Sequence, residues 1–377
     1  MKKKIVAVLL GGCMVAGLLA GCGGGSDTAS SDSASSDTAA EDSSSGGGDY
    51  HFEVVVKSFQ STYWQAAITG IDAAAEELGV DINTTGPNAE SDIADQVNML
   101  NNAISQAPDG IALAANDQSA VLPSLQDALD AGIPVVCFDT GVPDAPEGSV
   151  IATIATDNES AGAVAAENMY EVIKDTIANA SAPVRIGEVN QDATSANISG
   201  RGMGFINKMK ELIEADGKTV AVIGNQYYVD QVENNGDEGS ADVIIEVAVP
   251  AQTTVELSAT EASNIMNKED TIAIFGSNQV TAEGVLTANQ NLSVLAATPD
   301  EGIVGVGFDA GATLKAAVAD GTLIGAVTQA PVDQGNLAIH ALYDYCEGNE
   351  VEDIATDSYW YDAETMNDEN IAPNLYD

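Results

Sequence analysis

Two apolar runs, far apart in the chain, each end in the pattern Phe-Asp-x-Gly. The first is Gly132–Gly141, GIPVVCFDTG, and the second is Ile303–Gly311, IVGVGFDAG. An apolar run of this length, bounded by glycine, is typical of a parallel strand covered on both faces. In open α/β sheets, ligands bind at the carboxyl ends of such strands. We therefore predict two similar sheets, with Asp139 and Asp309 facing a shared cleft. The alternative, that each Asp only opens a turn, remains open.

Strand patterns and helical stripes alternate through the rest of the chain. Strand-like runs lie at residues 52–58, 80–84, 110–115 and 132–138, and the order restarts with runs at 184–189, 219–224, 243–249, 271–276, 303–308 and 323–327. Helical spacing of apolar residues fills the intervals between them. This alternation predicts an α/β fold of two doubly wound lobes, in which helices cover both faces of each parallel sheet.

Three segments interrupt this regular order. Residues 190–199 are predicted to be a loop that precedes a helix at 201–214. Residues 225–242 are polar and acidic, and are expected to form an inserted surface loop. A partial match to a calcium-binding loop at 231–242 begins with Gln where that template needs Asp, so we assign no metal site there. The acidic tail at 351–377 has no clear pattern.

The first 22 residues have the character of an export leader. Lysines at positions 2–4 precede an apolar stretch, Ile5–Leu19, that is shorter than the ~20 residues a spanning helix needs. The stretch ends in Leu-Ala-Gly-Cys, which resembles the lipobox of bacterial lipoproteins and would make Cys22 a lipidated first residue. An ordinary secretory leader is the alternative. Residues 23–49 lack large apolar side chains and are predicted to be a disordered tether.

The charge of the chain excludes several partners. The sequence holds 12 basic and 58 acidic residues, a net charge of −46, which becomes about −49 once the three leader lysines are removed. Such a surface repels phosphate backbones and anionic headgroups, so nucleic-acid binding and adsorption to a lipid surface are not expected. Beyond the leader, Cys137 and Cys346 are expected to be small buried apolar residues, although the sequence does not settle whether they are paired.

With this leader and two such halves, the chain resembles the solute-binding proteins of bacterial ABC importers, specifically the sugar-binding group related to ribose-binding proteins. The matching motifs span roughly residues 52–350: Ser61–Trp64, Gly132–Asp139, Ile154–Asn158, Arg201–Phe205, Phe275–Asn278, Val306–Asp309 and Thr328–Gln329. The resemblance implies two lobes joined by a three-strand hinge. We place the crossings near Thr156, Ala330 and Glu350, which gives lobes of 50–155 plus 330–350 and 156–329 plus 351–377.

The resemblance also implies a set of ligand-binding side chains. They comprise aromatic rings for the C–H face of a sugar, carboxylates and amides for its hydroxyls, and one guanidinium: Tyr63, Trp64, Asp139, Arg201, Asn278, Asp309 and Gln329. Alternatives remain for three of them. Trp64 would also suit the core, Asn278 would cap the helix that follows, and Arg201 would brace the fold, with Ser199 aligned better to the family's arginine. Ala114 and Thr140 depart from the family pattern, so a ligand other than ribose is expected.

The resulting hypothesis is a monomeric receptor, lipid-anchored at the outer face of the cytoplasmic membrane. It would bind a monosaccharide or similar small polyol and deliver it to an ABC permease, with no enzymatic activity, no cofactor and no metal. One alternative is a sensor that presents its ligand to a membrane kinase or chemoreceptor. A less favoured one is a glycoside hydrolase that uses Asp139 and Asp309 as an acid–base pair.

Overall fold

The computed structural model describes residues 50–377, so the expected leader, Cys22 and the tether lie outside the described residues. A first sheet of six parallel strands has the order β13-β5-β4-β3-β1-β2. Its strands are β1 (His51–Val55), β2 (Asp81–Thr85), β3 (Gly110–Leu113), β4 (Val135–Phe138), β5 (Val150–Thr156) and β13 (Ile354–Thr356). We call this sheet and the helices packed on it the first lobe.

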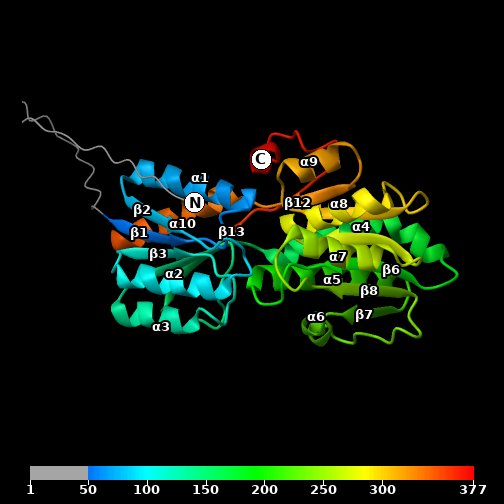
Figure 1. Cartoon of the computed structure of the whole chain (residues 1–377), viewed down its shortest axis with the longest axis horizontal. Coiled ribbons are helices and arrows are strands. Elements are labelled where there is room, and N and C mark those ends of the chain that lie inside the picture. The colour runs from blue at the N-terminus through cyan, green and yellow to red at the C-terminus, as the bar shows by residue number, and fades with distance from the viewer. Residues whose placement is uncertain (1–49) are drawn as a thin grey trace, which may run out of the picture. The chain divides into compact units, whose positions relative to one another are not determined.

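Helices cover both faces of the first sheet, as Figure 1 shows. On one face lie α1 (Thr62–Leu78) and α10 (Pro331–Cys346), and on the other lie α2 (Ile93–Ser105) and α3 (Leu122–Ala131). Successive side chains of β1 point to opposite faces: Val54 joins the core under α1 and α10, and Val55 joins the core under α2 and α3. This double burial explains why the central strands β3 and β4 are continuously apolar, whereas the edge strand β2 is polar.

The second sheet is larger, with the order β14-β12-β11-β9-β6-β8-β7 and a short β10 paired to β11. Its strands are β6 (Val184–Val189), β7 (Val220–Gly224), β8 (Val243–Ala248), β9 (Thr271–Gly276), β10 (Leu295–Ala296), β11 (Ile303–Phe308), β12 (Gly325–Thr328) and β14 (Tyr359–Tyr361). All pairings are parallel except that of β14 with β12. This sheet and its helices form the second lobe, and the predicted doubly wound α/β fold is confirmed.

The helices of the second lobe also pack on both faces of their sheet. They are α4 (Asn158–Asn179), α5 (Ala196–Ala215), α6 (Gln226–Gln231), α7 (Val255–Met266), α8 (Gln279–Leu292) and α9 (Ala312–Ala319). α4 and α5 lie on the same face and approach closely, because two glycines leave room for backbone contact: an added Cβ at Gly162 would lie 2.0 Å from Arg201 O, and one at Gly204 would lie 2.1 Å from Glu159 O.

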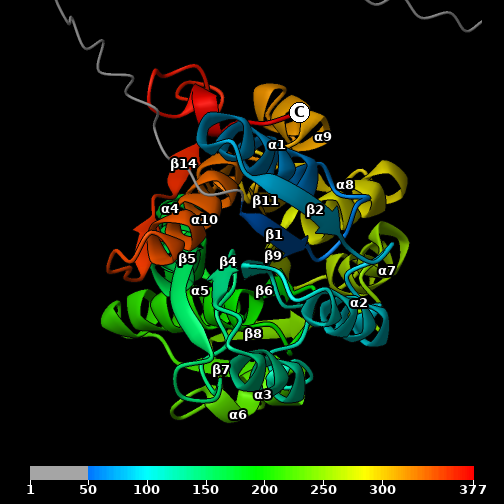
Figure 2. The same ribbon diagram turned by 90° about the vertical axis from the view of Figure 1, so that its left-hand side faces the viewer.

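The chain passes between the sheets three times. It leaves the first sheet after Thr156, at the end of β5, and returns to the first lobe between β12 and α10. Figure 2 shows helix α10 beside strands β4 and β5 of the first sheet. The third crossing is not near Glu350 as expected. The segment Ile354–Thr356 first adds to the edge of the first sheet beside β5, and the chain reaches the second sheet only at Tyr359.

Two further expectations about local structure are wrong. The segment 225–242 is not all loop, because it contains α6, whose Tyr228 is buried in the second-lobe core. Helix α5 begins at Ala196, five residues before the predicted start. Within residues 50–377 neither cysteine forms a disulfide. Cys137 is buried as expected, whereas Cys346 is only half-buried.

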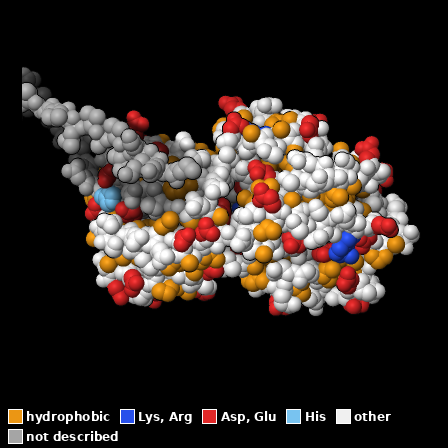
Figure 3. Space-filling model, in the orientation of Figure 1, with side chains coloured by type: hydrophobic (Ala, Val, Ile, Leu, Met, Phe, Trp, Pro, Cys, Tyr) orange, Lys and Arg blue, Asp and Glu red, His pale blue; other side chains and the backbone are white. Residues whose placement is uncertain are grey.

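The described surface is rich in acids, and Figure 3 shows Asp and Glu side chains spread over the face in view, with few Lys or Arg. Among residues 50–377 no helix combines the length and apolar character that a membrane span requires.

Candidate functional site

The two Phe-Asp-x-Gly segments form the same turn in the two lobes. Asp139 follows β4 and Asp309 follows β11, and both have positive φ, 62° and 74°. Each backbone N–H donates to the neighbouring strand, Asp139 to Ile154 O at 2.9 Å and Asp309 to Val327 O at 2.6 Å. The two carboxylates line one cavity. The prediction of a shared cleft is therefore confirmed.

All seven predicted ligand-binding side chains line this cavity. Its lining comprises Lys57, Ser61, Tyr63, Trp64, Glu90, Asp139, Asn197, Ile198, Arg201, Asn278, Gln279, Val280, Asp309 and Gln329. Ser199 is not among them. The cavity has a volume of only about 20 Å³, little more than a water molecule needs. A groove of about 410 Å³ adjoins it and shares Ser61, Glu90, Gln279 and Val280.

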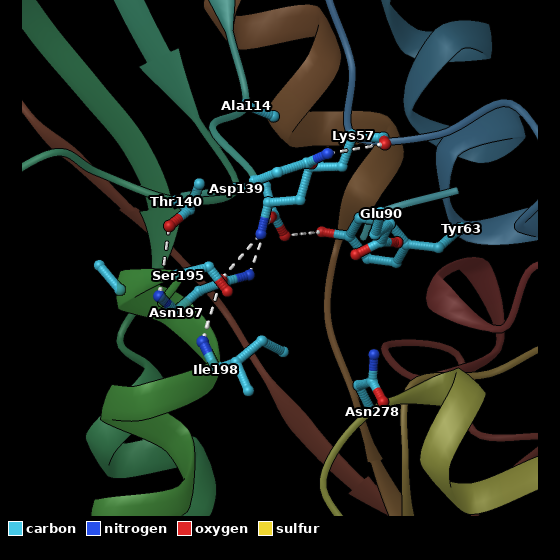
Figure 4. A network of polar contacts seen from close by, with 12 residues as sticks. Lys57, Tyr63, Glu90, Ala114, Asp139, Thr140, Ser195, Asn197, Ile198 and Asn278 are labelled. Atoms are coloured by element: carbon cyan, nitrogen blue, oxygen red, sulfur yellow. Dashed lines mark hydrogen bonds and ion pairs between the residues drawn. The ribbon is translucent and has the colours of Figure 1, made fainter. Parts of the chain in front are cut away.

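Asp139 is the centre of a hydrogen-bond network between the lobes (Figure 4). Its carboxylate accepts from Tyr63 Oη at 2.6 Å and from Asn197 Nδ2 at 2.8 Å, and Lys57 Nζ lies 3.3 Å away. Lys57 also donates to Asn197 Oδ1 at 2.9 Å, and the backbone N–H of Asn197 donates to Thr140 Oγ1 at 3.2 Å. Asn197 belongs to the second lobe and these partners to the first, so one amide holds the lobes together here.

Asp309 has different partners, both from its own lobe. Its carboxylate accepts from Gln329 Nε2 at 2.6 Å and from the Gln279 backbone N–H at 3.0 Å. Burial raises the pKa of Asp309, and the nearby Arg201 charge and these two hydrogen bonds oppose that rise. Because Nε2 of Gln329 is committed to the carboxylate, Oε1 faces the other way. This oxygen is buried and accepts no hydrogen bond from any group of residues 50–377.

Arg201 is fully buried, and the hydrogen-bond partners of its guanidinium come from its own lobe. Its guanidinium lies 3.6 Å from the centroid of the Phe308 ring, Nη1 donates to Ser277 O at 2.8 Å, and Nε and Nη2 donate to Asn158 Oδ1 at 3.2 and 2.8 Å. The side chain lines the cavity and also braces α4, α5 and β9 against one another. Its positive charge favours the ionised form of Asp309.

A chain of side-chain hydrogen bonds crosses between the lobes at the cavity wall. Trp64 Nε1 donates to Glu90 Oε1 at 2.7 Å, and Gln191 Nε2 donates to Glu90 Oε2 at 2.7 Å. Asn278 Nδ2 donates to Gln191 Oε1. Burial raises the pKa of Glu90, opposed by the Lys57 charge and by these donors. Asn278 also accepts from the Thr281 N–H in a capping box, so the capping alternative is correct and coexists with its place in the cavity wall.

Tyr63 connects the cavity to the hinge. Burial, followed by the Asp139 charge, raises its pKa well above the usual value, so the phenol remains a donor. Its single proton goes to Asp139, the shorter and charged contact, and its oxygen also lies 3.0 Å from Gln334 Oε1. Nε2 of Gln334 donates to Thr156 and Thr356, the last residues of β5 and β13, at 3.0 and 2.9 Å. Tyr63 and Trp64 both line the cavity and pack in the first-lobe core.

Sequence reasoning missed Lys57, Glu90 and Asn197. A usable signal existed for Lys57, because a charge at the end of an apolar strand needs a buried partner. Glu90 and Asn197 lie in polar segments where the sequence gives no such contrast. Within residues 50–377, no cluster of three or more His, Cys, Asp or Glu side chains is placed to hold a metal ion.

Two parallel α/β lobes, three connections between them and a shared polar cavity define the class of two-lobed ligand-binding proteins. The family model described as the periplasmic binding protein domain matches residues 52–350, and the chain belongs to that family.

Individual relatives agree with this assignment. The ribose import binding protein of Bacillus subtilis (strain 168) is 22% identical over 297 residues, covering 79% of this chain and 82% of that protein. Among solved structures, a Brachyspira murdochii protein described as an ABC transporter and LacI family transcriptional regulator is 31% identical, with a TM-score of 0.71 over 87% of this chain and 99% of its own. An ABC transporter solute-binding protein from Agrobacterium vitis with bound D-fucose is 26% identical, with a TM-score of 0.71 over 86% of this chain and 100% of its own.

Proposed function

We propose that this chain is an extracytoplasmic receptor that binds a monosaccharide or similar small polyol and delivers it to an ABC permease, without covalent chemistry. The observation that carries the proposal is Gln329 Oε1, a buried acceptor at the cavity that has no partner. A buried acceptor of this kind calls for a ligand that donates a hydrogen bond, as a hydroxyl does. The relatives described as a ribose import binding protein and as a solute-binding protein with bound D-fucose support the same ligand class.

Ligand entry requires the lobes to separate. A cavity of about 20 Å³ is far below the roughly 300 Å³ of small-molecule pockets. The polar groups that would contact a sugar hydrogen-bond to one another across the lobes, as in the contacts of Asn197 with Asp139 and Lys57. A sugar hydroxyl both donates and accepts, so it would replace these contacts pair by pair as the lobes close on it.

We also propose that Cys22 carries the lipid that anchors the receptor to the outer face of the membrane, with residues 23–49 as the tether. The leader sequence supports this assignment. If it is correct, the full-length protein partitions into detergent from the membrane fraction and a Cys22→Ser variant does not. Equal partitioning of both forms would contradict the anchor.

Calorimetric titration of the mature chain with a panel of monosaccharides and nucleosides tests the ligand class. We expect at least one monosaccharide to bind. Gln329→Met should weaken that binding by about 1–3 kcal/mol, because it removes both the acceptor and a hydrogen bond to Asp309. Gln252→Met, at an exposed position ahead of α7, is the matched control and should bind normally. A folded wild-type protein that binds no member of the panel would contradict the proposed function.

A further inference from the structure

The end of the chain is fastened to the second lobe beside the cavity. After β14 the chain forms a short 3-10 turn, Ala372–Asn374, and then runs to Asp377. Thr328 Oγ1 donates to Asn374 O at 2.8 Å, and Lys315 Nζ donates to Leu375 O at 3.1 Å and pairs with the Asp377 side chain. These contacts bring the penultimate residue, Tyr376, against the turn that carries Asp309.

Tyr376 makes three hydrogen bonds around that turn. Its hydroxyl accepts from the Ala310 N–H at 3.2 Å and donates to Gln279 Oε1 at 3.3 Å, and its carbonyl accepts from the Gly311 N–H at 3.1 Å. Gln279 in turn donates its own N–H to Asp309 Oδ2 at 3.0 Å. One tyrosine thus contacts both residues that follow Asp309 and the residue that binds its carboxylate.

The ring of Tyr376 faces the other lobe. It meets Tyr63 edge to face, with centroids 5.9 Å apart and planes at 79°, and packs against the first-lobe core. Aromatic pairs of this geometry stabilise beyond the area they bury. The amide of Gln279 extends the same connection, because its Nε2 donates to Thr62 Oγ1 of the first lobe at 2.9 Å.

Tyr376 does not line the cavity. Its ring nevertheless contacts Tyr63, a predicted ligand-binding residue of the first lobe, and its hydroxyl accepts from Ala310, which follows Asp309 in the second lobe. These contacts exist together only when the lobes are closed, because Tyr63 belongs to the first lobe and the Ala310 turn to the second. Burial raises the pKa of the Tyr376 phenol well above its usual value, so its donor to Gln279 persists at any physiological pH.

We propose that Tyr376 is a positioning residue that stabilises the closed, ligand-bound arrangement of the lobes by holding the Asp309 turn and the Tyr63 ring in register. The inference rests on the proposed function for its ligand, and it assigns the C-terminal tail a role in ligand retention. Interactions present only in the closed state slow ligand release and leave encounter with the open state unchanged. We therefore expect the main effect on koff, with kon affected only through the fraction of ligand-free protein that is open.

The test compares Tyr376→Phe, Tyr376→Ala and the control Tyr345→Phe, a substitution at an exposed tyrosine of α10. Stopped-flow kinetics use the mature full chain and the monosaccharide that binds wild type most tightly in the panel. Tyr376→Phe removes both hydrogen bonds of the hydroxyl and keeps the ring contact with Tyr63. It should raise koff at least about two- to tenfold, the factor that the loss of one neutral hydrogen bond corresponds to. Tyr376→Ala should raise koff further, and the control should match wild type. For both Tyr376 variants kon should rise by no more than the gain in the open fraction of the ligand-free protein.

Solution X-ray scattering of the same proteins without ligand gives a readout that does not depend on the sugar. Tyr376→Ala should increase the radius of gyration relative to wild type, because the closed arrangement loses a contact between the lobes. Unchanged koff in both Tyr376 variants, with a loss only of melting temperature, would overturn the inference. If wild type binds no sugar, the proposed function fails by its own titration, and the scattering comparison decides on Tyr376: a larger radius supports the role and an equal radius refutes it.

Discussion

Replacing Glu188 with glutamine should stabilise the protein at neutral pH. Glu188 lies in β6 with no exposed surface, and its Oε1 accepts from Asn190 Nδ2 at 2.6 Å. Its Oε2 and the Oδ1 of Asn190 are both buried without a partner. A protonated carboxyl satisfies both atoms at once, because an Oε2–H donates to Oδ1 and closes a two-bond pair with the amide. We therefore infer that Glu188 is a neutral acid, consistent with the rise in its pKa that burial causes.

The sign of the pH effect follows from proton binding. Above about pH 4.3 the unfolded chain releases the Glu188 proton while the folded chain retains it. Folding must then take up a proton, so the contribution of this group to stability is complete below that pH and is lost as the pH rises towards the folded-state pKa. The loss amounts to about 1.4 kcal/mol per pH unit. The glutamine side chain of the variant can make both hydrogen bonds to Asn190 and does not titrate, so the variant escapes this loss.

Urea unfolding at pH values from about 5 to about 8 measures the difference. We expect the advantage of Glu188→Gln over wild type to grow with pH by up to about 1.4 kcal/mol per unit. Glu352→Gln makes the same substitution at an exposed position and corrects for the effect of one acid fewer in a chain of net charge −46. A constant difference across the pH range, or a variant less stable than wild type at neutral pH, would refute a protonated Glu188.

Two other substitutions test packing and the cavity wall. Trp64→Phe removes the indole N–H that donates to Glu90. Because that hydrogen bond lowers the pKa of Glu90, the pKa should rise further in the variant. The variant should also lose about 1–3 kcal/mol of unfolding free energy, measured by urea unfolding over a pH series. Gly204→Ala should cost about 1–3 kcal/mol, since the new Cβ would lie 2.1 Å from Glu159 O, whereas Gly239→Ala, with no protein atom closer than 3.6 Å, should change stability by less than about 0.5 kcal/mol in the same assay.

Most of the fold could be predicted from the periodicity of apolar residues and from the residue types at strand ends and turns. The apolar runs that end at Asp139 and Asp309 predict buried parallel strands. The prediction is correct because helices cover both faces of each strand, so that successive side chains are all buried. The first residues of α5, 196–200, were not predicted to be helical, because Asn197, Ser199 and Gly200 disfavour a helix in isolation. In the folded chain the contact of α5 with α4 requires such small residues, so tertiary packing overrides the local preference.

The parts of the cavity that escaped prediction depend on contacts between lobes. Asn197 acquires its position only when the first turn of α5 meets Asp139 and Lys57 of the other lobe. Nothing local in the sequence marks such an amide. The structure of the tail could not be predicted for the same reason, because its tyrosines are placed by contacts with the distant Asp309 turn. Tyr361 donates to Asp309 O, and Tyr376 accepts from the Ala310 N–H.

The left-handed backbone at Asp139 and Asp309 affects how mutagenesis of this protein should be interpreted. Aspartate and asparagine tolerate that conformation, whereas a β-carbon without a polar group costs on the order of 1 kcal/mol there. Alanine scanning at these two positions would therefore mix lost ligand contacts with conformational strain in the empty receptor. Asparagine keeps the shape of the turn, so it tests each carboxylate without backbone strain. It removes the charge and also replaces one of the two acceptor oxygens, each of which accepts a hydrogen bond here, by a donor.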